Sequence, residues 1–187
     1  MSGSPATKGQ SWQNYRAAAW GTVGAMAQEY STRELVVARL ASVRAALEEA
    51  VSRLDERFLD WVPANGMRTV RGQLLEIVGT EIQFMARLRD GESLAWEHAE
   101  ARIHDRSLAG LKQELAKRRE ETLAYIASQP DEWLEQPAGF PTSWQETLGL
   151  TDAPVAEVLR GLAQHEAYHT GQLVSYLWAR GDDPYQW

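Results

Sequence analysis

The sequence predicts an all-α protein, a four-helix bundle with an extra helical arm at its N-terminus. Two observations support this fold. Apolar residues recur at steps of three and four along four long segments, and no alternating apolar and polar stretch is long enough for a sheet. The 187 residues, 44% of them hydrophobic, can bury one sizeable core. We therefore divide the chain into an arm or short helix over residues 1–30 and a bundle domain over residues 31–187.

The first long helix carries the clearest local signals. It begins at Ser31-Thr-Arg-Glu34, a capping box in which the serine oxygen accepts a backbone N–H and the glutamate reaches back. Apolar residues then continue at helical spacing as far as Phe58, and the turn residues of segment 63–66 follow. We expect one unbroken helix between these limits.

Three further helices are predicted over residues 69–89, 107–129 and 152–181. Asp90-Gly91 ends the first of them, Ser107 caps the second, and Asp152 is expected to cap the third, with Pro154 in its first turn. The charged segment between the first two carries His98 and His104, which we expect to be exposed and unconnected with any site.

Composition excludes several classes of protein. The chain has no cysteine, so disulfides, thiolate ligands and structural zinc fingers are excluded. Twenty-six acidic and nineteen scattered basic residues give a net charge of −7, so nucleic acid is not an expected partner. The chain contains no run of eighteen apolar residues of the kind that crosses a membrane. Its first ten residues contain no apolar segment typical of a secretion signal. We expect a cytoplasmic protein.

One turn of the last helix carries the strongest chemical signal. His165 and His169 are four residues apart, so both imidazoles lie on one helix face, a spacing that suits a single transition-metal ion. They interrupt an apolar stripe that begins at Val155, so we expect them to face the core. A buried imidazole that lacks a partner costs about 1–3 kcal/mol, which favours a metal or hydrogen bonds there. A pair of hydrogen-bonded core histidines is the alternative.

The neighbours of the histidines allow further expectations. Gln172 and Tyr176 continue the stripe and should pair with polar groups between helices, or meet a metal-bound water or a substrate. Glu166 points away from His165, and we expect a solvated surface carboxylate. Gly171 costs about 1 kcal/mol of helix propensity relative to alanine. We expect a neighbouring helix or a substrate to approach it closely.

Two imidazoles leave a metal ion undercoordinated, so a third ligand should project from a facing helix. The helix over residues 69–89 offers Glu76 and Glu81. Glu81 lies on the apolar seam with Ile77 and should be the more buried of the two. Glu76 lies about 100° around the helix from Ile77, on a polar flank with Gln73 and Thr80. Periodicity alone does not select Glu76.

Two segments, Thr69–Glu81 and His165–Leu173, resemble the DinB/YfiT-like superfamily of four-helix-bundle metalloproteins, a likeness that extends over roughly residues 32–187. In that family the first segment usually carries a histidine ligand seven residues after the threonine, and the second supplies the histidine pair. Glu76 stands at that position here. The resemblance therefore implies a site of Glu76, His165 and His169, with Zn or Ni as the first expectation and Fe or Mn as alternatives.

Members of the family also include thiol-dependent isomerases and transferases that use low-molecular-weight thiols such as mycothiol or bacillithiol. The resemblance thus implies a metalloenzyme that activates water or such a thiol against a small-molecule substrate, as a hydrolase or a thiol transferase. Glu81 and Gln172 are candidates for acid/base groups or for partners of the ligands, and Glu81 is also the alternative to Glu76 as the third ligand. The alternatives are a non-catalytic, dimeric binding or stress-response module and a site inactivated by Glu76. We expect a homodimer.

Overall fold

The structure is a computed structural model of the chain, and it describes residues 29–141, 143, 146, 149 and 152–187. Residues Ser31–Trp187 form one compact unit. Nearly all of the predicted arm over residues 1–30 lies outside the described residues. Within the described part, the secondary structure is helical and contains no strand.

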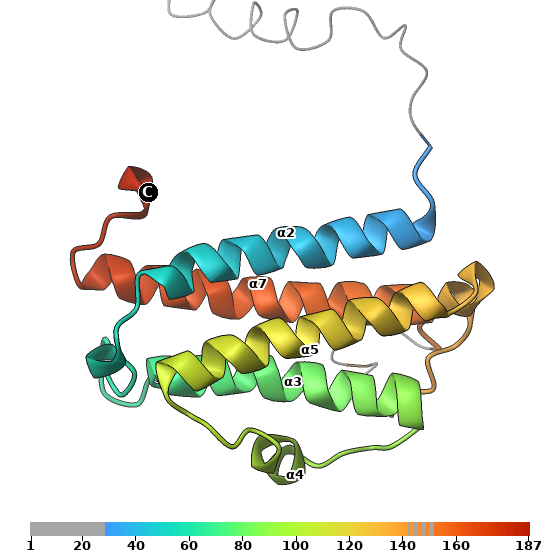
Figure 1. Cartoon of the computed structure of the whole chain (residues 1–187), viewed down its shortest axis with the longest axis horizontal. Coiled ribbons are helices and arrows are strands. Elements are labelled where there is room, and N and C mark those ends of the chain that lie inside the picture. Colours follow the sequence, from blue (N-terminus) through green and yellow to red (C-terminus); the bar gives the residue numbers. More distant parts are fainter. Residues whose placement is uncertain (1–28, 142, 144–145, 147–148, 150–151) are drawn as a thin grey trace, which may run out of the picture. The chain divides into compact units, whose positions relative to one another are not determined.

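The predicted four-helix bundle is confirmed. Its long helices are α2 (Thr32–Ser52), α3 (Val70–Asp90), α5 (Leu108–Ser128) and α7 (Val155–Ala179). The helix α2 packs against α7, and α3 packs against both α5 and α7 (Figure 1). The shorter elements are the helix α4 (Trp96–Ala101) and the 3₁₀ turns η1 (Glu56–Phe58), η2 (Asp131–Glu135) and η3 (Pro184–Gln186).

The helix starts follow the local signals in three of the four cases. The side chains of Ser31, Thr69 and Ser107 each accept a hydrogen bond from a backbone N–H in the first turn of α2, α3 and α5. Gly91 ends α3 in the left-handed conformation, with φ of 70°. These caps confirm the predicted limits of α3 and α5.

The predicted end of the first helix was wrong, because α2 stops at Ser52 rather than at Phe58. The chain turns there, and Asp55 is extended ahead of the short turn η1. This turn buries Leu54 and Phe58 together, and the guanidinium of Arg180 lies 3.6 Å from the centre of the Phe58 ring. Packing of these apolar side chains therefore overrides continuation of the helix.

The predicted cap of the last helix was also wrong. Asp152 lies outside α7 with a positive φ of 51°, and Pro154 is the N-cap without a side-chain cap bond. The N–H of Val155 instead donates to the carbonyl oxygen of Gln136 at 2.9 Å. A contact with the preceding connection thus replaces the local cap.

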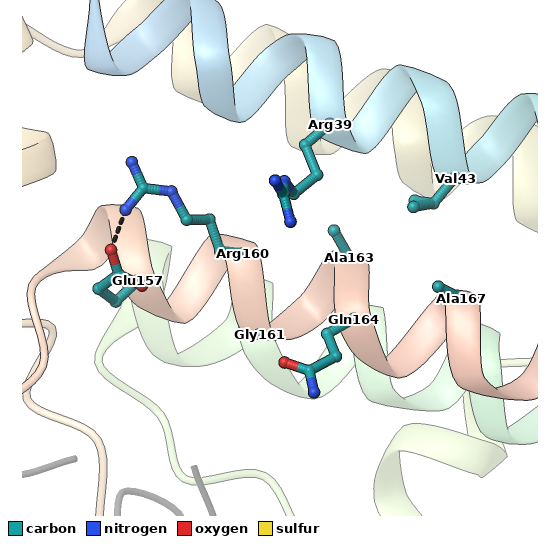
Figure 2. Close-up of a pocket in the computed structure, with 8 residues that line it drawn as sticks. All are labelled: Arg39, Val43, Glu157, Arg160, Gly161, Ala163, Gln164 and Ala167. Atoms are coloured by element: carbon teal, nitrogen blue, oxygen red, sulfur yellow. Dashed lines mark hydrogen bonds and ion pairs between the residues drawn. The ribbon is translucent and has the colours of Figure 1, made fainter. Parts of the chain in front are cut away.

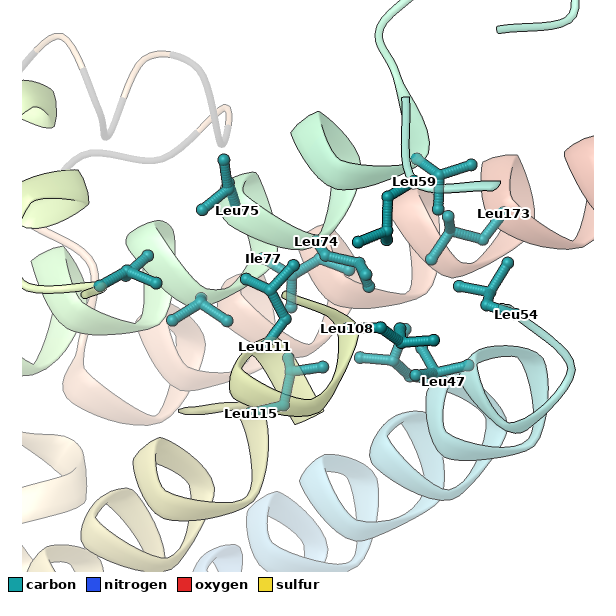
Figure 3. Close-up of a cluster of buried hydrophobic side chains, with 14 of the residues drawn as sticks. Leu47, Leu54, Leu59, Leu74, Leu75, Ile77, Leu108, Leu111, Leu115 and Leu173 are labelled. Atoms are coloured by element: carbon teal, nitrogen blue, oxygen red, sulfur yellow. The ribbon is translucent and has the colours of Figure 1, made fainter. Parts of the chain in front are cut away.

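Two clusters of buried apolar residues fill the bundle. One, shown in Figure 3, includes Leu47, Leu111 and Leu173 from three different helices. The other includes Leu40, Ile126 and Leu162 from the same three helices. Along α2, α5 and α7, the stretch between the two clusters carries a buried charged residue, which is Arg44, Arg119 and Glu166 in turn. The bundle therefore contains a polar layer between two apolar ones.

We call this layer the central charge cluster, and it consists of Arg44, Glu81, Arg119 and Glu166. Each long helix contributes one member, and each member is at most 5% exposed. Both arginines pair with both glutamates, at nitrogen–oxygen distances of 2.6–2.9 Å. Two positive and two negative charges balance, so the layer is formally neutral. Buried charges are tolerated when they are paired in this way.

The expectation that Glu166 is solvated was therefore wrong, since its exposed fraction is only 1%. Glu166 does point away from His165, as one residue further along a helix turns the side chain by about 100°. That direction leads into the core. The core stripe of α7 passes through Leu162, Glu166 and Leu173, whereas His165 lies on its half-buried flank.

None of the helices in the described residues is both long and apolar enough to cross a lipid bilayer.

Candidate metal centre

Three side chains with metal-binding atoms converge between α3 and α7. Glu76 comes from α3, and His165 and His169 come from α7; one ligand atom of each lies within 4.8 Å of the others. The two Nε2 atoms of the histidines are 3.1 Å apart. Two ligands bound to one ion at about 2.1 Å can be at most about 4.2 Å apart. The three donors therefore need only a small adjustment of the Glu76 side chain to share an ion.

The ring of His169 is oriented by two amide oxygens. Its Nδ1 donates to Oε1 of Gln73 at 2.5 Å and to Oε1 of Gln172 at 2.9 Å. Because an amide oxygen only accepts hydrogen bonds, the proton of the neutral ring belongs on Nδ1. The lone pair of Nε2 is then free and points toward His165. This is the arrangement that a metal-binding histidine requires.

His165 completes the pair with fewer partners. Its Nε2 lies 3.4 Å from the hydroxyl oxygen of Thr80 on α3, and its Nδ1 is buried without a hydrogen-bond partner among the described residues. Two Nε2 lone pairs at 3.1 Å repel each other unless a proton or a cation lies between them. The geometry therefore suits either a hydrogen bond between the rings or a shared metal ion.

Both imidazoles are held in the form that binds metals. Burial lowers the pKa of His165 to about 4, and the charges of His169 and Arg68 add to this effect. Burial also lowers the pKa of His169, although its hydrogen bond to Gln172 and the charge of Glu76 oppose the change, while Arg68 adds to it. Neutral rings at pH 7 leave their lone pairs available to a cation.

A cavity of about 280 Å³ opens beside the site. Its walls include Arg68, His169, Gln172 and Tyr176. The guanidinium of Arg68 pairs with the Glu76 carboxylate, and the Tyr176 hydroxyl donates to the backbone oxygen of Arg68 at 2.8 Å. A ligand or a water molecule in this cavity would therefore lie next to His169, one of the three candidate ligands.

The sequence matches one known family over most of its length. Residues 11–173 match the model of the DinB superfamily. The chain belongs to the DinB superfamily. No curated protein matches the sequence. The family match begins at residue 11, and it therefore includes part of the segment that the sequence analysis treats as an arm.

In this DinB superfamily member, the donor set fits a divalent ion. One carboxylate and two neutral imidazoles provide three ligands, and such a set leaves at least one coordination position for water or substrate. The resemblance had singled out Glu76 where periodicity had not. The structure brings this residue to both histidines, as the resemblance implied.

The other candidate from α3, Glu81, lies in the central charge cluster. Its burial, predicted from the apolar seam, is confirmed at 1% exposure. Its carboxylate accepts hydrogen bonds from Arg44, Arg119 and the hydroxyl of Thr122, and none of the hydrogen bonds in the described part of the chain joins it to an imidazole. The structure thus places the two glutamates in different environments.

Three other expectations concern α7 and its surroundings. Gln172 lies in the site through its bond to His169. The expected approach of a neighbouring helix to Gly171 was wrong, because no described atom of another helix lies within 4 Å of a methyl group placed there. His98 and His104 are exposed, as predicted.

Sequence reasoning did not assign roles to Gln73, Thr80 and Arg68. A signal existed for the first two, since Gln73, Glu76 and Thr80 are spaced by three and four residues and so form one polar flank of α3. Gln73 and Thr80 each contact one of the histidines, and a carboxylate oxygen of Glu76 lies within 4.8 Å of a ring nitrogen of both. Arg68 precedes the helix, and its position gave no such signal.

A second groove, of about 420 Å³, lies between α2 and α7. Figure 2 shows Arg39 of α2 and Arg160 of α7 reaching toward the space between these helices, with Arg160 paired to Glu157. Its lining contains no histidine, and its one carboxylate is already paired. The groove between α2 and α7 therefore lacks the donors of a metal centre, in spite of its larger volume.

Proposed function

We propose that this DinB superfamily protein is a metal-dependent enzyme in which Glu76, His165 and His169 hold a divalent transition-metal ion. Zn or Ni is the first candidate, and Fe or Mn are alternatives. The observation that carries the proposal is the convergence of one carboxylate and two neutral imidazoles, with facing Nε2 atoms, beside an open cavity.

A bound ion would lower the pKa of a coordinated water or thiol and polarise a carbonyl group, which supports hydrolysis or thiol transfer on a small molecule. The residues of the chain have separate roles in this proposal. Gln73 and Gln172 position His169 by accepting its Nδ1 proton. The cavity admits the substrate to the open side. Glu81, which two arginines hold, stabilises the bundle instead of taking part in the reaction.

A non-catalytic module remains the competing function. A structural metal site closes its shell with four protein ligands, whereas a catalytic site keeps a position open. The group identified among the described residues has three donors, and a cavity adjoins it. These two features favour chemistry over a purely structural ion.

A homodimer belongs to the same proposal. Trp178 of α7 and Tyr185 of η3 are 52% and 80% exposed, which is high for such large side chains, and the centres of their rings lie 5.6 Å apart. A second copy would cover this apolar surface. Light scattering on the purified chain would measure the mass directly, and a monomer at micromolar concentration would refute this part.

The metal site is tested by elemental analysis of untagged protein reconstituted with Zn or Ni. We expect about one equivalent per chain in the wild type and loss of most of it in the His169→Ala variant. His98→Ala removes an exposed histidine from α4 and is the matched control, which should bind as the wild type does. Equal metal content in wild type and His169→Ala would rule out the site.

A second measurement separates the two proposed reactions. Cobalt in place of the native ion would show a thiolate-to-cobalt absorption band when a small thiol coordinates it. A band that appears with the thiol and is absent in His169→Ala supports thiol activation. An absorption spectrum of the cobalt-loaded protein that does not change on addition of thiols would favour water as the activated group.

A further inference from the structure

The carboxylate of the proposed metal centre already has a cationic partner. Arg68 pairs with Glu76, the one carboxylate among the three converging donors. The backbone of Arg68 is held by the hydrogen bond from Tyr176, and the next residue, Thr69, caps α3. The side chain of Arg68 is 46% exposed. The backbone is therefore fixed while the guanidinium can move.

Arg68 and a metal ion compete for the same negative charge. A divalent cation at the three donors would lie beside the guanidinium, and two positive charges at such a distance repel each other. Coordination would also draw the Glu76 carboxylate toward the ion and away from the guanidinium. Both effects favour departure of the guanidinium from Glu76 once the ion is bound.

The cavity beside the site gives the released guanidinium a place to act. Arg68 is the one residue among the described lining residues that is a lysine, arginine, aspartate or glutamate. Met67 and Tyr168, which are 45% and 63% exposed, add apolar and aromatic surface. A planar guanidinium pairs best with a carboxylate, through two parallel hydrogen bonds.

We propose that Arg68 is a specificity-determining residue that exchanges partners: it pairs with Glu76 in the metal-free protein and with the carboxylate of a small aromatic substrate when the ion is bound. The inference rests on the proposed metal centre and adds a substrate class to it. No covalent step is involved, only an exchange of ion pairs.

The first test measures zinc affinity by competition with a chromophoric chelator. Arg68→Met should bind zinc about threefold to tenfold more tightly than the wild type, because the competing cation is gone. Arg71→Met is the matched control, since it removes the same charge from the first turn of α3, where Arg71 pairs with Asp60 and not with Glu76. Unchanged or weaker zinc binding by Arg68→Met would overturn the exchange. Melting curves establish that each variant is folded.

The second test measures binding of benzoate to the zinc-loaded protein by calorimetry, with neutral benzamide as the comparison. The wild type and Arg71→Met should bind benzoate about tenfold more tightly than Arg68→Met. Equal benzoate affinity in all three would show that the carboxylate needs only the ion, and would overturn the inference. A wild type that takes up no zinc would refute the metal centre itself, an outcome distinct from normal zinc binding without any effect of Arg68.

Discussion

The two glutamates of α3 should respond in opposite ways to the same substitution. Glu81→Gln and Glu76→Gln each remove one negative charge while keeping the side-chain volume. We expect Glu81→Gln to lower the stability of the bundle and leave metal binding intact. We expect Glu76→Gln to weaken metal binding and leave the stability of the metal-free protein almost unchanged.

The magnitudes follow from burial. Glu81 is 1% exposed and accepts hydrogen bonds of 2.8–2.9 Å from Arg44, Arg119 and Thr122. Its neutralisation leaves two buried guanidiniums with Glu166 as their only carboxylate in the central charge cluster. Breaking a buried ion pair from one side costs about 3–5 kcal/mol. For a chain of this size, that loss lowers the melting temperature by roughly 6–20 °C.

The ion pair of Glu76 is more exposed, with 25% of its own side chain and 46% of the Arg68 side chain accessible to solvent. Such pairs contribute about 0–1 kcal/mol. The assay combines denaturant unfolding of the metal-free proteins with elemental analysis after reconstitution. Loss of metal in Glu81→Gln with retention in Glu76→Gln would make Glu81 the third ligand. Wild-type stability of Glu81→Gln would refute the reasoning about the central charge cluster.

Three further substitutions test other contacts. Gln73→Leu removes an acceptor from Nδ1 of His169 and should weaken metal binding roughly tenfold to a hundredfold, as measured by chelator competition. Gly79→Ala would place a methyl group 2.7 Å from the Trp96 ring. We expect the tryptophan fluorescence to change and the free energy of unfolding to fall by roughly 1–3 kcal/mol. Replacement of all four members of the central charge cluster by apolar residues of similar volume should leave stability equal or raise it by about 1–4 kcal/mol in denaturant unfolding, and a loss of several kcal/mol would contradict this.

The parts of the fold that depend on local signals were predictable. The caps at Ser31, Thr69 and Ser107 depend only on residues within one helical turn. The end of α3 depends only on the glycine that follows it, whatever surrounds the helix. The errors arose where distant residues decide. The end of α2 depends on burial of Phe58 beneath Arg180, and the start of α7 depends on the backbone of Gln136.

The site was predictable in composition but not in orientation. The spacing of His165 and His169 fixes their common face on any helix. It does not fix which way that face points. The apolar periodicity predicted both histidines on the core stripe. His169 is buried as predicted, whereas His165 lies on a half-buried flank beside α3.

The inward direction of Glu166 on α7 is the feature that local sequence signals did not indicate. A glutamate beside a histidine pair looks like a surface residue unless its partners are known, and these partners, Arg44 and Arg119, are 122 and 47 residues away. The sequence of α5 nevertheless contains a sign of one of these partners. The apolar seam of α5 has a gap between Leu115 and Thr122, and Arg119 fills it. A buried arginine requires a buried acid, so each such gap predicts a carboxylate on a facing helix. Applied to α7, that requirement would have turned Glu166 inward and moved His165 to the half-buried flank, with His169 still buried.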